Sequence, residues 1–334
     1  MIFRRLLVVC LAPFLLGTNL SPALPSTPGE YPIFLPIVIQ PGPSVGGCPS
    51  FPLDNIWNAR VDYLPVDPNS ANYIKSIGID TSLHADFGSG LWDGGPIGIP
   101  FITVPGTQPK VAITFKYSGE SDPGPYPIPA NVPIEGGSKS TGDRHILIVD
   151  RDNCMLYEAW SSYPQSNGSW KAGSGAVYNL RSNDLRPDGW TSADAAGLPI
   201  LPGLVRYDEA ASGAINHAIR FTADDTRNTY VWPARHYASD ETSLAIPPMG
   251  QRFRLKASVN ISSFPLPVRA ILQAFKTYGL ILADNGSSWY ISGVPDERWD
   301  NDQLAEAFGQ LQGSDFEAVN VSSLMVDPNS GKIK

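Results

Sequence analysis

The sequence predicts a mainly β fold, a β-sandwich or jelly-roll-like core with a small C-terminal α/β appendage. The chain of 334 residues contains 31 glycines and 32 prolines, which interrupt it every few residues. Short runs rich in β-branched and aromatic residues lie between them, a pattern typical of sandwiches and barrels. Helical periodicity is scarce before residue 264, so we expect the main helices to belong to the appendage, over about 264–321.

Seven runs in the first part of the chain have the character of strands. We expect them at 111–117, 145–150, 154–160, 176–180, 215–222, 229–232 and 252–257. A short helix precedes them, beginning with a cap at Asn69 or Ser70 and ending at Ile77.

Two helices are predicted in the C-terminal block. Apolar residues at helical spacing indicate a helix over 267–278, which ends at Gly279. A second helix over 302–311 begins after a cap at Asp300 or Asn301. Both helices are expected to pack on the β core within the same domain.

Three strands complete this block. The Asn285-Gly286 pair is a strong hairpin signal and predicts a tight turn between strands at 280–283 and 289–291. A last strand is expected at 317–321.

The N-terminus has the layout of a cleaved secretory signal. Arg4 and Arg5 precede an apolar run over 6–16, and Ser21-Pro22-Ala23 offers a cleavage site. We expect residues 1–23 to be a signal peptide, 24–47 a linker rich in Pro, Ser and Gly, and 48–334 a single globular domain. The apolar run is shorter than the ~20 residues of a membrane-spanning helix. A secreted, extracellular protein without a membrane partner is therefore expected.

The charge balance argues against nucleic acid as a partner. The 24 Lys and Arg residues are outnumbered by 32 Asp and Glu residues, for a net charge of −8. Binding to a phosphate backbone requires clustered Lys and Arg, and the sequence has no such cluster. We expect a monomer.

The cysteines predict a disulfide bond. Cys10 lies in the expected signal peptide, which leaves Cys48 and Cys154 as an even pair in an exported chain. A bond between them would close a loop of more than 100 residues and, in the chain-entropy model, stabilise the fold by roughly 4 to 5 kcal/mol. Two buried free thiols are the alternative.

Several stretches resemble a family of secreted bacterial proteins that has no established activity. They are 278–286 (Tyr-Gly-Leu-Ile-Leu-Ala-Asp-Asn-Gly), 289–293 (Trp-Tyr-Ile-Ser-Gly), 216–222 (Asn-His-Ala-Ile-Arg-Phe-Thr) and 232–236 (Trp-Pro-Ala-Arg-His). The resemblance implies export and one domain that covers most of the chain after Cys48. It implies no mechanism.

The candidate catalytic residues are Glu158, His145 and His217. Strand alternation places Glu158 with Leu156 and Trp160, and places each histidine with the apolar residues of its own strand. A glycoside hydrolase needs one protonated and one ionised carboxyl group. Glu158 is the best candidate for the acid because aromatic residues flank it, and Asp86, Asp143 and Asp150 are possible partners.

The candidate substrate-binding residues are Arg220, Arg235, His236, Trp160 and Tyr157. A polysaccharide lyase would need a base, such as His217, and an arginine to neutralise the carboxylate of a uronic acid. A metal bound by histidines is a third alternative, but no local histidine spacing supports it, and we expect no cofactor.

These observations together predict a secreted carbohydrate-active enzyme. It would cleave an extracellular or cell-wall polysaccharide by acid-base chemistry, as a glycoside hydrolase or a polysaccharide lyase. A non-catalytic polysaccharide-binding or cell-surface protein is the alternative. Tryptophans in loops rich in Gly, Ser and Asp favour a binding surface, namely Trp92, Trp170, Trp190 and Trp299.

Overall fold

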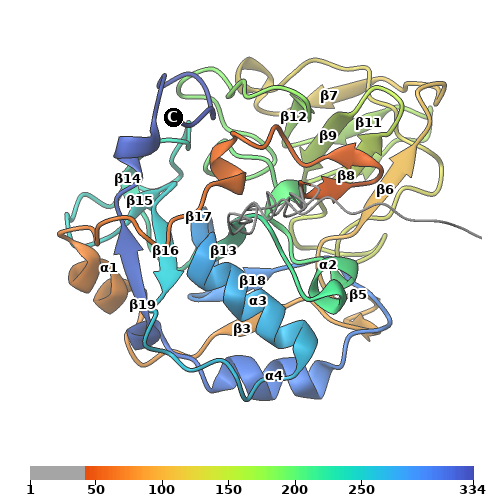
Figure 1. Ribbon diagram of the computed structural model, residues 1–334. Helices are drawn as coiled ribbons and strands as arrows, with labels where there is room; N and C mark the ends of the chain where they lie inside the picture. Colours follow the sequence, from red (N-terminus) through yellow and green to blue (C-terminus); the bar gives the residue numbers. More distant parts are fainter. Residues whose placement is uncertain (1–41) are drawn as a thin grey trace, which may run out of the picture. The chain divides into compact units, whose positions relative to one another are not determined.

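Strands predominate over helices in the computed structural model, which describes residues 42–334 (Figure 1). The predicted mainly β fold is therefore confirmed. The described residues form one compact unit. The expected signal peptide, residues 1–23, and the linker as far as residue 41 lie outside the described residues. Within 42–334, no helix has both the length and the apolar character needed to cross a membrane.

A four-stranded sheet has the order β12, β9, β8, β6. Its strands are β6 (Phe101–Val104), β8 (Ile146–Asp150), β9 (Met155–Trp160) and β12 (Ser174–Asn179). β8, β9 and β12 are antiparallel neighbours, and β6 is parallel to β8. All of β8 is buried, because Leu147 and Val149 face the main hydrophobic core and Ile146 and Ile148 face a smaller one.

A three-stranded sheet contributes to the smaller core. It has the order β10, β11, β7, with β7 (Ile113–Phe115), β10 (Tyr163–Pro164) and β11 (Trp170–Ala172). Ile113 and Ala172 pack there with Ile148 from β8. The main core lies on the other face of β8 and β9 and includes helices as well as strands. A β-sandwich is therefore not confirmed.

The largest sheet has six strands in the order β19, β16, β17, β13, β18, β3. They are β3 (His84–Asp86), β13 (Ile219–Ala223), β16 (Arg252–Leu255), β17 (Leu280–Asn285), β18 (Tyr290–Ser292) and β19 (Phe316–Val319). The expected C-terminal strands are thus integrated with β3 and β13 from earlier in the chain. They belong to the six-stranded sheet, in which β17 is a central strand and β19 an edge strand, so they do not form a separate appendage.

Within the described residues four α-helices accompany the strands, and three of them were expected. They are α1 (Ser70–Ile77), α2 (Tyr207–Ser212), α3 (Leu266–Thr277) and α4 (Asn301–Gly309). α1 packs against β19, α3 against β16 and α4 against β3. The Asp300 side chain caps α4 and accepts a hydrogen bond from the Gln303 amide at 3.0 Å. In Figure 1 α3 crosses the front of the six-stranded sheet and α4 runs along its lower edge.

The hairpin predicted at Asn285-Gly286 is wrong. β17 and β18 do not pair with each other, because β13 lies between them, parallel to β17 and antiparallel to β18. A two-residue turn of the predicted type needs positive φ at both residues, and neither residue has it. Instead the Asn285 side chain donates to the Ala238 carbonyl, and the Gly286 amide donates to the Ala223 carbonyl.

Short elements connect these sheets. Three small ladders are formed by β1 (Ser44–Val45) with β2 (Cys48–Pro49), β4 (Leu91–Trp92) with β5 (Gly95–Pro96), and β14 (Arg227–Tyr230) with β15 (Pro248–Met249). The 3₁₀ turns are η1 (Ile56–Asn58), η2 (Ser118–Glu120), η3 (Leu201–Gly203), η4 (Gly313–Asp315) and η5 (Ser322–Leu324). The end of the expected linker, over 44–45, is therefore a strand.

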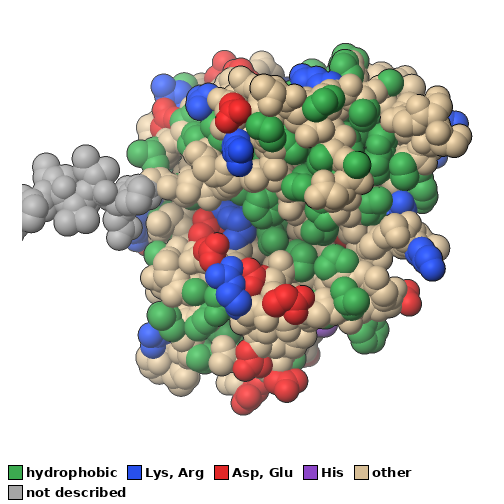
Figure 2. Space-filling model, turned by 90° about the vertical axis from the view of Figure 1, so that its right-hand side faces the viewer, with side chains coloured by type: hydrophobic (Ala, Val, Ile, Leu, Met, Phe, Trp, Pro, Cys, Tyr) green, Lys and Arg blue, Asp and Glu red, His purple; other side chains and the backbone are tan. Residues whose placement is uncertain are grey.

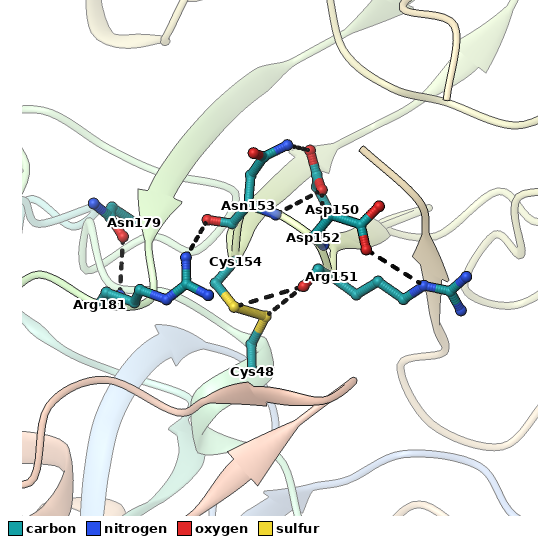
Figure 3. The surroundings of a disulfide bond; sticks show 8 residues. All are labelled: Cys48, Asp150, Arg151, Asp152, Asn153, Cys154, Asn179 and Arg181. Carbon is teal, nitrogen blue, oxygen red and sulfur yellow. Dashed lines mark hydrogen bonds and ion pairs between the residues drawn. A yellow bond between two sulfur atoms is a disulfide. The ribbon is translucent and has the colours of Figure 1, made fainter. Parts of the chain in front are cut away.

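The predicted disulfide joins Cys48 and Cys154, whose Cα atoms are 5.4 Å apart (Figure 3). Both sulfur atoms lie near the Arg151 carbonyl oxygen, in the turn between β8 and β9. Asp150 holds this turn by accepting hydrogen bonds from the amides of Asp152 and Asn153. The bond therefore tethers the N-terminal hairpin to the four-stranded sheet.

Candidate acid-base site

A cavity of about 380 Å³ opens where strand ends of the two large sheets come together. Trp160 lies at the end of β9, Ser174 at the start of β12, and Asp284 near the end of β17. The remaining wall comes from loops, from η2 and from the last residue of β17, and contributes Tyr117, Glu120, Asp143, residues 191–195, His236, Ala238 and Asn285. The cavity thus combines aromatic rings, four carboxyl groups and one imidazole.

A buried arginine joins two of these carboxyl groups. Arg220, on β13, donates from Nε and Nη2 to the two carboxylate oxygens of Asp194, both at 2.7 Å. Its Nη2 also donates to Asp284 Oδ2 at 3.1 Å, and its Nη1 donates to Ser292 Oγ at 2.5 Å. One guanidinium nitrogen, Nη2, is thus shared by the carboxyl groups of Asp194 and Asp284. Arg220 therefore holds the two acids side by side.

The two acids of this pair have different environments. The Asp194 side chain is fully buried and bound bidentately by the Arg220 guanidinium. The Asp284 side chain is 22% exposed and faces the cavity. Burial, followed by the negative charge of Asp194, raises the pKa of Asp284 well above its ordinary value of 3.8, and Arg220 offsets only part of this rise. Asp284 is therefore an acid that keeps its proton to unusually high pH.

An aromatic wall and two further carboxylates complete the cavity. Tyr117 and Trp160 are stacked, with centroids 6.4 Å apart and ring planes at 27°. The Trp160 indole Nε1 donates to Asp143 Oδ1 at 2.9 Å, which orients that carboxylate. His236 donates from Nδ1 to the Ala195 carbonyl, and its Nε2 lies 3.7 Å from Glu120 Oε2. These groups can bind hydroxyls and stack on the apolar face of a sugar ring.

Glu158 does not line this cavity. Strand alternation places it with Leu156 on the main core side of β9, as expected, but that side is sealed and Glu158 is fully buried. Its carboxylate accepts hydrogen bonds from the amides of Ile200 and Leu201. Burial outweighs these bonds and raises the pKa of Glu158 to about 7. Its observed partners indicate a structural role, holding the loop before η3 against β9.

The two histidines predicted to be catalytic are also buried, and they belong to separate clusters. His145 contacts Glu135 through Nδ1 at 2.6 Å and donates from Nε2 to the Ala193 carbonyl at 3.0 Å. His217 lies 3.2 Å from Glu209 through Nε2 and contacts the Ala218 carbonyl through Nδ1. The structure therefore does not bring Glu158, His145 and His217 together in an open cavity.

The predicted substrate-binding residues divide into two groups. Trp160 and His236 line the cavity. Arg220 lies beneath it with its guanidinium occupied, and Arg235 is buried and bound to the Pro328 carbonyl and to Asn329. Tyr157 faces the smaller core, where its hydroxyl accepts from Lys110. Neither arginine is free to clamp a substrate.

Sequence reasoning missed most of the acids of the cavity. Asp194 follows a buried alanine in a loop without strand or helix periodicity, and Asp284 lies in the stretch that was expected to turn between the strands at 280–283 and 289–291. Asp143 was only one of three possible partners for Glu158. The informative signal was indirect, since Arg220 points away from the apolar side chains of β13, and a carboxylate is the common partner of a buried arginine.

A metal centre gains no support from the described residues. Within 42–334, no group of three or more His, Cys, Asp or Glu side chains is arranged to hold an ion.

A scan against protein-family models and searches of the curated proteins and the solved structures found no match. The chemistry of the cavity is therefore the basis on which function is inferred.

Proposed function

We propose that this protein is a secreted carbohydrate-active enzyme that cleaves an extracellular or cell-wall polysaccharide as a glycoside hydrolase. The observation that carries the proposal is Asp284, an acid of raised pKa that faces an aromatic-walled cavity. Glycosidases pair an acid that stays protonated with a second, ionised carboxylate. Export is supported by the signal-like N-terminus and by the disulfide, a bond typical of oxidising compartments.

The roles follow from the contacts of each acid. Asp284 gives its proton to the glycosidic oxygen as the bond from that oxygen to the anomeric carbon breaks. Asp143, oriented by the Trp160 indole, takes a proton from the water whose oxygen bonds to that carbon. Trp160 and Tyr117 stack on the sugar. Asp194 and Arg220 are positioning residues, because they hold Asp284 and act on the substrate through it.

Charge favours a hydrolase over a lyase. A uronate-cleaving lyase needs a free cation to neutralise the substrate carboxylate, and Arg220 and Arg235 are already occupied. Carboxyl groups of the cavity would repel a polyanion, as would the net charge of −8. Acidic side chains also gather along the lower edge of the face in Figure 2. A neutral or amino sugar is therefore the favoured substrate class.

The test is a screen for new reducing ends on neutral, amino and acidic polysaccharides, with Asp284→Asn beside the wild type. Asparagine has the shape of the protonated acid and can still accept a hydrogen bond from Arg220, but it has no proton to transfer. We expect a loss of about 10²- to 10⁴-fold. Asp225→Asn, at an exposed position after β13, is the matched control and keeps full activity.

The outcomes separate the candidate functions. Wild-type activity is expected to fall as the pH rises through the pKa of Asp284, since the acid then loses its proton. Full activity in a correctly folded Asp284→Asn variant would refute the assignment. Unsaturated products would favour a lyase. Binding without cleavage by the wild type would favour the non-catalytic polysaccharide-binding protein.

A further inference from the structure

A second cavity, of about 570 Å³, has walls of the same chemical character as the first. Trp92, on β4, lines this cavity and is 78% exposed. The His84 ring stacks on Tyr290 with centroids 4.2 Å apart and ring planes at 27°. Asp86 and Glu135 add carboxyl groups. Exposed aromatic rings beside carboxyl groups are suited to binding sugar rings and their hydroxyls.

One imidazole ring separates the walls of the two cavities. Glu135 lines the second cavity, and its Oε2 lies 2.6 Å from His145 Nδ1. On the other side of the ring, His145 Nε2 lies 3.0 Å from the carbonyl oxygen of Ala193, which lines the first cavity. The cavities are therefore neighbours.

A single surface segment also connects the two cavities. The segment 135–143 begins with Glu135 in the second cavity and ends with Asp143 in the first. Arg144 Nη1 donates to the carbonyls of Ser138 and Ser140, at 2.9 and 3.0 Å, and so fixes the path of this segment. A ligand that extends from one cavity to the other would cross a surface that is already held in place.

The electrostatics of His145 agree with this arrangement. Burial by itself lowers the pKa of His145, but the negative charges of Glu135 and then Asp143 raise it to about 9. Carboxylates from both cavities thus lie close enough to act on the same buried ring. A protonated His145 in turn partly neutralises the acids on either side of it.

We propose that the two cavities are subsites of one cleft that binds an extended chain of neutral or amino sugars across the segment 135–143. This inference rests on the proposed function and deepens it. A sugar near Trp160 is placed for cleavage by Asp284, while Trp92 stacks on a unit further along the chain. The enzyme would then cut within long chains, because a disaccharide occupies only one cavity.

The experiment measures binding to reducing-end-labelled oligosaccharide ladders, from disaccharide to octasaccharide, of chitin, β-1,4-glucan and β-1,3-glucan. Trp92→Ala is expected to weaken octasaccharide binding about tenfold and to leave disaccharide binding unchanged. Trp160→Ala weakens binding at every length. Tyr63→Ala, which also removes an exposed ring but lines neither cavity, is the matched control and changes nothing.

The results distinguish this inference from the proposed function. If Trp92→Ala binds every length as the wild type does while Trp160→Ala is impaired, the single-cleft inference is overturned and the proposed function stands. If the wild type binds no member of any ladder, both are overturned. Weaker disaccharide binding by Trp92→Ala would also contradict the inference, because it would place Trp92 at the cleavage subsite.

Discussion

Replacement of Glu158 by glutamine is predicted to remove a large pH dependence of stability. The carboxyl group is fully buried, and burial raises its pKa from an ordinary 4.5 to about 7. The folded state therefore binds the proton more tightly than the unfolded state does. Between pH 4.5 and about 7 the folded chain carries more of this proton, so the free energy of unfolding falls as the pH rises.

The size of the effect follows from the same numbers. A difference of one in pKa corresponds to about 1.4 kcal/mol, so a rise from 4.5 to about 7 is linked to about 3 kcal/mol. Wild type loses this stability between pH 4 and pH 8. Glu158→Gln does not, because glutamine keeps an acceptor for the Leu201 amide and carries no charge.

The assay is urea denaturation of both proteins at pH 4 and pH 8, with the disulfide intact. Groups remote from Glu158 titrate alike in the two proteins, so the difference between their free energies of unfolding reports on Glu158 and the few groups coupled to it. Between pH 4 and pH 8 we expect the free energy of unfolding of the variant, relative to that of the wild type, to increase by about 3 kcal/mol. Glu306→Gln, at an exposed position on α4, is the control and shows no shift. If Glu158→Gln and the wild type differ in free energy of unfolding by the same amount at pH 4 and at pH 8, the reasoning is refuted.

Three further predictions concern stability. Replacing both Cys48 and Cys154 by serine opens a loop with a sequence separation of 106 residues and should cost about 4 to 5 kcal/mol in urea denaturation; a cost below about 1 kcal/mol would contradict the tethering role. Arg220→Met leaves Asp194 buried without its cation and should cost about 3 to 5 kcal/mol. Arg269→Met, on the exposed side of α3, is its control, and equal effects of the two changes would exclude a special role for Arg220. Asp300→Ala removes the cap of α4 and should lower the free energy of unfolding by about 1 kcal/mol, without changing the pH profile of any cleavage activity.

Local patterns were sufficient to predict most elements. The runs at 145–150 and 154–160 correspond to β8 and β9 within a residue, because alternation of side chains along a strand is a property of the strand itself. The helix expected at 267–278 and the cap at Asp300 are likewise local features. The cysteine pair could be predicted since only one pairing was possible after export.

Strand pairing was decided by tertiary structure. Asn285-Gly286 has the residues of a hairpin turn, yet β13 separates the strands on either side of it. Parallel pairing of β13 with β17 satisfies backbone groups of both strands along a buried ladder, and a local turn preference is too weak to compete with that. Among the tryptophans expected to be exposed, Trp92 is exposed and Trp299 is buried beside Phe87, because only packing decides which loops are covered.

By itself, then, the sequence determined the β character, the helices, the disulfide and which face of its strand Glu158 occupies. Only the tertiary structure decided that this face is sealed, and that Asp194, Arg220 and Asp284 meet at the floor of an open cavity. The physical reason is that periodicity reports the orientation of a side chain relative to its own strand. Solvent access and the pKa of an acid depend on what other segments place beside it, and the segments that line this cavity come from residues 117 to 285 of the chain.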